Sequence, residues 1–421
     1  MSECEGQRCV PEPSFVNPQY EITAMSLQSA TRAVRSGIDT DPNFGAVIPP
    51  LYLSTNFSFA GLDGKRRYDY TRSGNPTRDL LAEALSELEG GAGTVVTASG
   101  MAAVGLVLEL LEPGQLLVVP HDCYGGSHRL FRACAGKGRF ELAVIDFHDA
   151  AALGAALARG PALVWIETPS NPLLRITDIR HVAAAAKAAG ATVVVDNTFL
   201  SPALQQPIAL GADIVVHSTT KYINGHSDVV GGAVVAADAA LHETLAWWAN
   251  ATGVTGAPFD SYLTLRGLRT LNVRLRAHQE NTLVLAEHLN VHPAVAAVHF
   301  PGLASHPGHA LAARQQSGFG AMLSFDLHGG VPAVRAFVDG LACFTLAESL
   351  GGVESLIAHP ASMTHAAMPE QARRLAGIGD GLLRVSVGIE DGRDLLADID
   401  AGLARAEAVL CGRSKANGAL S

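Results

Sequence analysis

The chain has 421 residues, of which 48% are hydrophobic and 17% are charged, and its formal net charge is -10. This length allows two domains with a large core, and the composition excludes an intrinsically disordered protein. The acidic balance argues against a surface for nucleic acid or anionic membranes, because phosphate backbones need a basic face.

No apolar run is long enough to span a bilayer, and the first residues are charged and contain no apolar signal segment. The six cysteines form no Cys-x-x-Cys pair and are too few for a disulfide scaffold. Together these features predict a cytoplasmic protein with reduced thiols. The sixteen histidines are scattered and form no ligand motif, so we expect no metal site.

The first 75 residues predict little regular structure. Residues 1–25 are polar and contain three prolines, so we expect a flexible tail. Residues 26–75 are predicted to form an extended arm that packs on a neighbouring subunit, because residues 43–60 mix prolines with apolar side chains. A helix then begins at Pro76 with Asn75 as its N-cap, and Gly90 and Gly91 end it.

Short apolar runs alternate with helical patterns, such as 101–111 and 178–189, in the next part of the chain. Several runs are apolar on both faces, as strands of a covered parallel sheet should be. We therefore predict a layered α/β domain over residues 76–280. The predicted strands are 94–97, 115–119, 142–145, 162–166, 192–195, 214–216 and 232–235.

The last third of the chain changes character. Residues 261–290 predict one long helix that joins the α/β domain to the remainder. Residues 321–327 and 382–387 alternate like half-buried strands, and residues 393–410 predict a helix. These patterns indicate a smaller α+β domain over residues 281–421.

Ligands of parallel α/β sheets bind beyond the carboxyl ends of the strands, and polar residues follow several of the predicted strands. Ser99 can cap a helix whose first N–H groups, at Gly100 and Met101, suit a phosphate. Asp196 directly follows an apolar strand, where a carboxylate needs a partner such as a protonated pyridine nitrogen. Taken alone, these residues could also be a helix cap and a turn aspartate.

Lys221 follows a third strand end, together with the hydroxyl donors Ser218 and Thr220. Lysine is scarce in this chain, with five residues, and a dry site would lower the pKa of this amine and favour an imine. By itself Lys221 could equally be a surface lysine. The chain has no P-loop, dinucleotide fingerprint or Gly-x-Ser-x-Gly elbow. The combination therefore predicts pyridoxal 5'-phosphate (PLP) as the cofactor.

Eight segments resemble the Cys/Met-metabolism PLP-dependent enzymes, and they occur in that family's order between about residues 26 and 410. The resemblance implies an aspartate-aminotransferase-like fold (fold type I), with a mostly parallel seven-stranded sheet and a smaller α+β C-terminal domain. It also implies a homotetramer built from two active dimers. The segments are YDYTRSGNPT (68–77), SGM (99–101), HDCYGGSHRLF (121–131), TPSNPLL (168–174), DNTFLSP (196–202), STTKYINGHSD (218–228), AESLGGVES (347–355) and RVSVGIED (384–391).

The same resemblance implies how the cofactor would be held. Lys221 would bind it covalently and later move protons between carbons, and Asp196 would pair with the pyridinium nitrogen. The phosphate contacts would be Ser99, Gly100, Met101, Ser218 and Thr220, with Tyr70 and Arg72 reaching it from the neighbouring subunit. The dimer would then be the active unit.

Further roles implied by the resemblance concern the ring and the substrate. Tyr124 would stack on the ring and act as an acid–base group, and Asn171 would contact the ring hydroxyl. Arg384 would bind the substrate α-carboxylate with its planar fork, helped by Ser349. Taken alone, these could be a core tyrosine, a turn residue and a surface charge. The predicted substrate contacts are completed by Tyr70, Arg129, Asn171 and Glu348.

Residues 246–271 resemble family members that carry out γ-replacement on an activated homoserine more than members that cleave cystathionine by γ-elimination. Glu348 fits both groups and differs from members that cleave methionine. Ser73 departs from members that use succinylated homoserine, which can carry an arginine there, and Arg129 is the remaining candidate for the succinyl carboxylate. We expect O-succinyl-L-homoserine as donor and L-cysteine as acceptor. Acetyl or phospho esters, γ-elimination, and a PLP-binding regulator without turnover remain alternatives.

Overall fold

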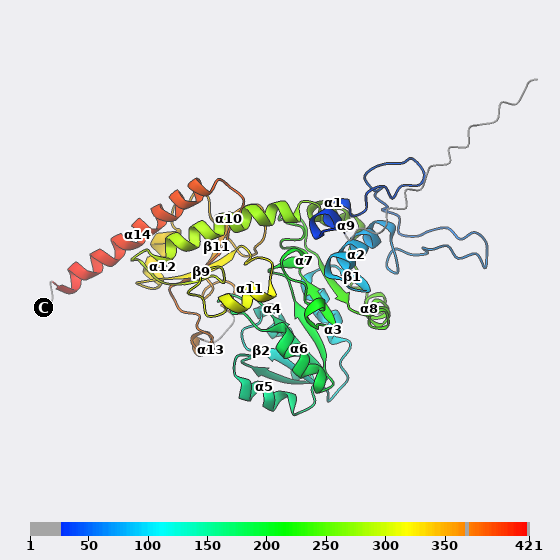
Figure 1. Ribbon diagram of the computed structural model, residues 1–421, viewed down its shortest axis with the longest axis horizontal. Coiled ribbons are helices and arrows are strands. Elements are labelled where there is room, and N and C mark those ends of the chain that lie inside the picture. The colour runs from blue at the N-terminus through cyan, green and yellow to red at the C-terminus, as the bar shows by residue number, and fades with distance from the viewer. Residues whose placement is uncertain (1–26, 367–369, 419–421) are drawn as a thin grey trace, which may run out of the picture.

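The computed structural model describes residues 27–366 and 370–418. The tail expected over residues 1–25 lies outside this part. The expected arm is not extended throughout, because Ser29–Arg35 forms helix α1, whose Ala33 is buried against the body. Beyond α1 the arm forms loops that project from the body up to the start of the next helix (Figure 1).

Helix α2 (Pro76–Glu89) begins and ends where the sequence predicts. The side chain of Asn75 accepts hydrogen bonds from the N–H groups of Thr77 and Arg78, at 2.9 and 3.4 Å. Gly90 adopts the left-handed conformation, with φ 75°, that ends many helices. The helix thereby reaches the sheet with Leu85 and Leu88 fully buried.

A seven-stranded sheet forms the centre of the larger part, with strand order β1-β7-β6-β5-β4-β2-β3. β7 runs antiparallel to the other six strands, which are parallel to one another, so the predicted mostly parallel sheet is confirmed. Each of the seven predicted strands matches an observed one to within one residue at either end. The strands are β1 (Gly93–Thr97), β2 (Leu116–Pro120), β3 (Glu141–Ile145), β4 (Leu163–Glu167), β5 (Thr192–Asp196), β6 (Ile214–His217) and β7 (Gly232–Ala236).

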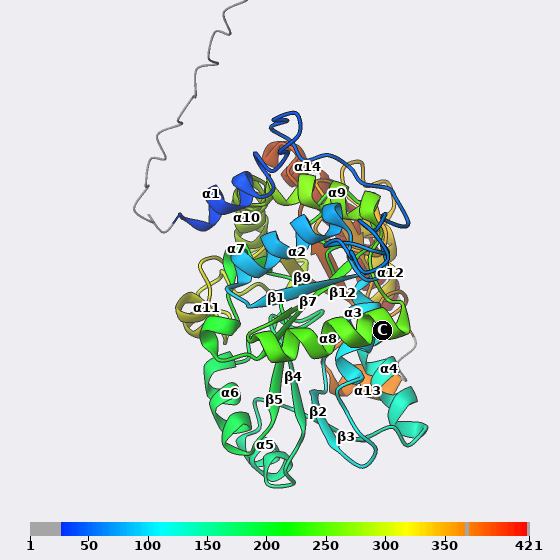
Figure 2. The same cartoon turned by 90° about the vertical axis from the view of Figure 1, so that its right-hand side faces the viewer.

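Helices cover both faces of this sheet, which explains why the strands are apolar on both sides (Figure 2). Alternation along β4 sends Trp165 into the core beneath one group of helices and Ile166 into the core beneath the other. The first group is α3 (Gly100–Leu108), α4 (Gly125–Gly136) and α8 (Ala239–Thr252), and the second includes α5 (Ala150–Leu157) and α6 (Ile179–Ala188). The short helices α7 (Ser201–Leu204) and η1 (Ile208–Leu210) follow β5.

The prediction of one helix over residues 261–290 is wrong, because the chain forms α9 (Pro258–Leu268) and α10 (Leu271–Asn290) with a break between them. The carbonyl of Gly267 accepts a hydrogen bond from the guanidinium of Arg274 at 2.9 Å. A side chain at position 267 would collide with the backbone of Asn224. The break therefore lies where Gly267 approaches the backbone of Asn224, a distant contact that the local sequence does not signal.

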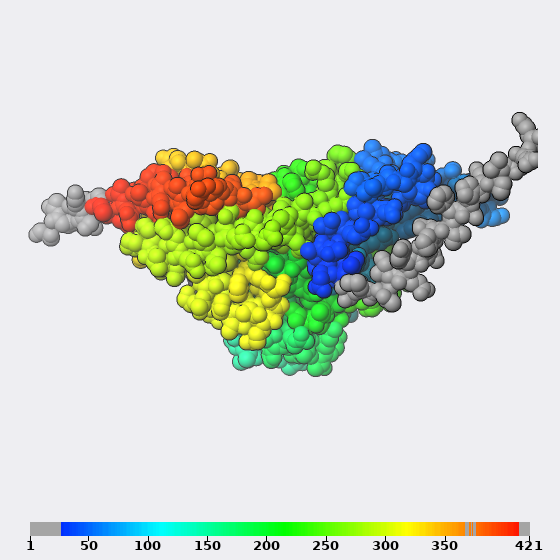
Figure 3. Space-filling model, turned by 45° about the horizontal axis from the view of Figure 1, so that its top comes forward, coloured from blue at the N-terminus to red at the C-terminus, as the bar shows by residue number. Residues whose placement is uncertain are grey.

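The smaller sheet has the order β10-β11-β12-β9-β8 and packs against α10, α12 (Val331–Val338) and α14 (Gly392–Gly418). Figure 3 shows α14 lying along α10 at the end of the molecule away from the N-terminal arm. Within the described residues, no helix is long and apolar enough to cross a membrane. The remaining elements are β8 (Val295–His299), β9 (Met322–Leu327), β10 (Thr345–Leu346), β11 (Leu356–Ala358), β12 (Leu382–Ser386), α11 (His309–Gln315) and α13 (Glu370–Leu375).

Candidate active site

A cavity of about 470 Å³ lies beyond the carboxyl ends of β4, β5 and β6, where ligands of such sheets bind. Polar groups of both sheets reach it, since β12 and the segment before β11 belong to the smaller one. Its lining brings together most of the predicted residues: Ser99, Gly100, Met101, Tyr124, Asn171, Asp196, Ser218, Thr220, Lys221, Glu348, Ser349 and Arg384.

Lys221 follows β6 and points its amine toward the smaller domain. Its Nζ donates a hydrogen bond to Ser349 Oγ at 2.7 Å. Burial, and then the charge of Arg384, lowers the pKa of Lys221 to about 8, against the opposing effect of Glu348. A lysine amine with this pKa is available in its neutral, nucleophilic form far more often than an exposed one.

We expect the rate at which the apoprotein binds PLP covalently to rise with pH and to level off above about 8. The neutral amine attacks the aldehyde, and the lowered pKa of Lys221 means that half of the amine is already neutral at this pH and little gain remains at higher pH. Stopped-flow absorbance of apoprotein mixed with PLP measures this profile. A profile that still rises steeply toward the ordinary lysine pKa of 10.5 would contradict the buried environment.

Asp196 and Glu167 end the neighbouring parallel strands β5 and β4 and pair directly in register. Asp196 Oδ1 accepts a hydrogen bond from Thr198 N at 3.0 Å, and Glu167 Oε2 accepts one from Tyr124 N at 2.8 Å. Burial raises the pKa of Asp196, and burial together with Asp196 raises the pKa of Glu167 well above its usual range. Two adjacent carboxyl groups in a dry wall favour a cationic partner for one of them.

Sequence reasoning missed Glu167, although a signal was present. Glu167 follows the apolar run 162–166 directly, in the same way that Asp196 follows the next strand. Both side chains line the cavity. A carboxylate directly after an apolar run that forms a parallel strand is therefore a sequence signal for a residue of the site.

The N-terminus of α3 faces Ser218 across the cavity wall. Ser99 Oγ accepts from Ala102 N at 3.0 Å, so Ser99 caps the helix. A Cβ atom at Gly100 would lie 2.7 Å from Ser218 Cβ, so only glycine permits this approach. Thr220 Oγ1 accepts a hydrogen bond from Gly231 N at 3.0 Å. The first turn of α3 and these hydroxyls form a donor set that suits a phosphate.

Arg384 reaches the cavity from β12 and is buried. Its Nη1 donates to Asn171 Oδ1 at 3.2 Å, and its Nη2 donates to the carbonyl of Ser349 at 2.9 Å. Its Nε is buried without a partner among the described residues. Burial lowers the pKa of Arg384 to about 10, so the guanidinium remains charged at neutral pH and can bind an anion.

Tyr124 precedes α4 and lines both this cavity and a second one of about 740 Å³. A Cβ atom at Gly126 would lie 2.5 Å from the Tyr124 ring, so this glycine allows the ring its position. Arg129 lines only the second cavity. The two cavities are contiguous, because Asn171, Glu348 and Thr364 also belong to both.

Two predicted cofactor residues do not reach the cavity of their own chain. Arg72 Nη1 donates to the carbonyl and the side-chain oxygen of Asn250, at 2.6 and 3.0 Å, and Tyr70 is exposed. Neither residue lines the cavity. Within one chain the site is therefore assembled without them.

The donor set of the cavity fits PLP. The helix N-terminus and hydroxyls suit its phosphate, the carboxylate of Asp196 suits its ring nitrogen, and the amine of Lys221 suits its aldehyde. The chain belongs to the Cys/Met-metabolism PLP-dependent enzymes, because the model of that family matches residues 30–404. The resemblance stated from the sequence, the fold and the cofactor are thereby confirmed.

Several known proteins are similar over nearly the whole chain. Cystathionine γ-synthase of Escherichia coli K12 is 56% identical over 90% of this chain and 98% of its own length. The enzyme of the same name from Mycobacterium tuberculosis H37Rv is 48% identical over 89% of this chain and 96% of its own. The crystal structure of cystathionine γ-synthase from Xanthomonas oryzae pv. oryzae with cystathionine is 69% identical, with a TM-score of 0.90, over 91% of this chain and 100% of that chain.

Proposed function

We propose that this chain is a cystathionine γ-synthase, which converts O-succinyl-L-homoserine and L-cysteine to L-cystathionine and succinate. The observation that carries this proposal is the 69% identity to an enzyme of that name whose structure holds cystathionine. A site for amino-acid substrates agrees with it, since a buried arginine and a buried amine share one cavity.

The position of each residue in the cavity indicates its role in the reaction. Bound PLP supplies an electron sink for the negative charge that develops on the substrate carbons. Lys221 would hold the aldehyde, and after the substrate amine displaces it, its neutral amine would carry protons at the α and β carbons. Tyr124, at the border of the two cavities, is the second group placed to accept or donate a proton.

Substrate binding follows from the same geometry. Arg384 would bind the α-carboxylate through its unpartnered Nε and its fork, while Asn171 and the carbonyl of Ser349 fix its plane. Cofactor contacts are proposed for Ser99, Gly100, Met101, Asp196, Ser218 and Thr220. Asn171 and Glu348 line both this cavity and the second one, where the γ-substituent would extend, whereas Ser349 lines only the first.

We propose a homotetramer of two active dimers, in which Tyr70 and Arg72 complete the cofactor site of the neighbouring subunit. The arm that carries them exposes large apolar side chains, among them Phe44 at 92% and Leu62 at 96% exposed, which favours burial against another subunit. A cytoplasmic location is proposed because the four described cysteines are unpaired.

The donor is tested by comparing O-succinyl, O-acetyl and O-phospho esters of homoserine, each with cysteine, in the wild type and in Arg129→Ala. We expect the succinyl ester to react best, and Arg129→Ala to lower its kcat/KM about tenfold while leaving the acetyl ester nearly unchanged, because only the succinyl group carries the extra carboxylate. Arg132→Ala, which changes another arginine of the second cavity, is the matched control. Release of 2-oxobutyrate and ammonia from cystathionine alone as the faster reaction would favour γ-elimination, and PLP binding without turnover would favour a regulator.

A further inference from the structure

A buried polar network lies on the face of the large sheet opposite the cofactor cavity. Side chains alternate along a strand, so Asn197 and His217 point away from the cavity that Asp196 and Val216 line. Glu89, at the end of α2, meets them there, and Glu89, Asn197 and His217 are all at most 1% exposed. None of the three lines the cavity.

The centre of this network is an ion pair. Glu89 Oε1 lies 2.6 Å from His217 Nε2 and also accepts a hydrogen bond from Asn197 Nδ2 at 2.9 Å. Glu89 Oε2 and His217 Nδ1 are buried without a partner among the described residues. Each member of the pair is therefore a necessary polar partner for the other, because a polar group without a partner at this depth would be costly.

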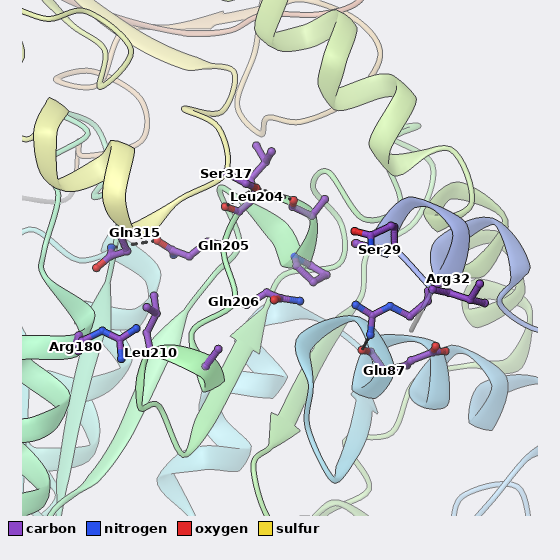
Figure 4. Close-up of a pocket in the computed structure, with 15 residues that line it drawn as sticks. Ser29, Arg32, Glu87, Arg180, Leu204, Gln205, Gln206, Leu210, Gln315 and Ser317 are labelled. Carbon is purple, nitrogen blue, oxygen red and sulfur yellow. Dashed lines mark hydrogen bonds between the residues drawn. The ribbon is translucent and has the colours of Figure 1, made fainter. Parts of the chain in front are cut away.

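Gln205 extends the network toward the neighbouring strand ends. The side-chain Nε2 of Gln205 donates hydrogen bonds to Asn197 Oδ1 at 3.0 Å and to the backbone carbonyl of Thr168 at 3.1 Å. The backbone carbonyl of Gln205 accepts a hydrogen bond from Asn197 Nδ2 at 2.9 Å. Figure 4 shows Gln205 bonded to Gln315 at the wall of a separate pocket, and their separation is 3.2 Å. Hydrogen bonds on the face opposite the cavity thus connect the ends of β4, β5 and β6.

These tied strand ends are the ones that carry the cavity groups. Residue 168 follows Glu167, residue 197 follows Asp196, and residue 217 precedes Ser218. The network therefore sets the spacing between the proposed partner of the ring nitrogen and one wall of the proposed phosphate site. A change in this spacing would alter the affinity for the cofactor even in the absence of substrate.

Charge acts in the same direction as geometry. The ionisable groups nearest Asp196 are Glu167 from β4, Cys123 from the loop after β2, Lys221 in the shared cavity, and His217 from β6. Burial raises the pKa of Asp196, and the hydrogen bonds from Thr198, and then the positive charge of His217, oppose that effect.

We propose that Glu89 and His217 are a positioning pair, which holds Asp196 in register against the pyridine ring from the far side of the sheet. Glu89 holds the ring of His217 in place at 2.6 Å, and a positive charge on that ring acts on Asp196 across the backbone. The inference rests on the proposed pairing of Asp196 with the cofactor, and it is independent of the amino-acid substrate.

The test measures the dissociation constant of PLP from the apoprotein by equilibrium dialysis across a range of pH. We expect Glu89→Gln and His217→Gln each to weaken PLP binding about tenfold at neutral pH, since each change disturbs the support of Asp196 behind the strand ends. The acidic limb of the affinity profile should move toward neutral pH, because Asp196 would then bind its proton more readily. The double variant should lose little more than either single one, as coupled groups do.

Glu87→Gln is the matched control, because it removes a carboxylate from the exposed side of the same helix. His217→Gln keeps a donor toward Glu89 and so separates charge from packing, and the melting temperature of each apoprotein is recorded. A loss of affinity that is equal at every pH and follows the melting temperature would reduce the pair to a structural role and overturn the proposal. Unchanged affinity in both variants would overturn it as well. If Asp196→Asn also bound PLP like the wild type at every pH, the assignment of Asp196 itself would be at fault.

Discussion

Replacement of Lys221 by alanine abolishes covalent attachment of PLP and lowers kcat by about 10⁴-fold or more. Partial burial lowers the pKa of the Lys221 amine to about 8, and this amine donates a hydrogen bond to Ser349 in the cavity. Alanine removes the group that would bind the aldehyde and also the group that would carry protons. The visible spectrum after reduction with borohydride and the steady-state rate measure the two losses separately.

Lys137→Ala serves as the control, because Lys137 lies in the turn after α4 and outside the cavity. It should leave both the spectrum and the rate unchanged. A Lys221→Ala protein that retained the wild-type rate would refute the assignment of the cofactor lysine, whatever its spectrum.

Replacement of Asp196 by asparagine retains part of the bound cofactor but lowers kcat by about 10²–10³-fold. An amide accepts a hydrogen bond from a ring nitrogen, yet it supplies no charge to hold that nitrogen protonated. The ring then becomes a poorer electron sink, so the loss should fall on kcat more than on KM.

The rate of α-proton exchange provides an independent measurement for Asp196→Asn. Exchange of the α-proton of a substrate analogue into deuterated water, followed by NMR, should slow by a similar factor as kcat. Full activity with unchanged exchange would show that Asp196 does not pair with the ring nitrogen.

The sequence predicts the large domain well because its signals are local. Each strand is a short apolar run, and Asn75, Pro76 and Gly90 mark both ends of α2. Lys221 and Asp196 could be found because each follows such a run directly. The family resemblance then supplied residues such as Arg384, for which a half-buried strand alone gives no functional signal.

Features decided by distant contacts were not predictable in this way. The break between α9 and α10 depends on Arg274 and on the backbone of Asn224. The pair Glu89 and His217 joins residues 128 positions apart, and neither residue stands out in its own segment. Such pairs arise from the packing of helices on the sheet, and a single sequence carries no record of that packing.

The hydrogen bond between Arg384 and Asn171 connects two separately packed parts of the chain, because Arg384 lies in β12 of the smaller sheet and Asn171 follows β4 of the larger one. An amino acid whose carboxylate binds Arg384 and whose amine reaches Lys221 would contact both parts and connect them. Substitutions that destabilise the core of the smaller domain should therefore raise the KM for amino-acid substrates while PLP stays bound. Such variants would be yellow holoproteins with little activity.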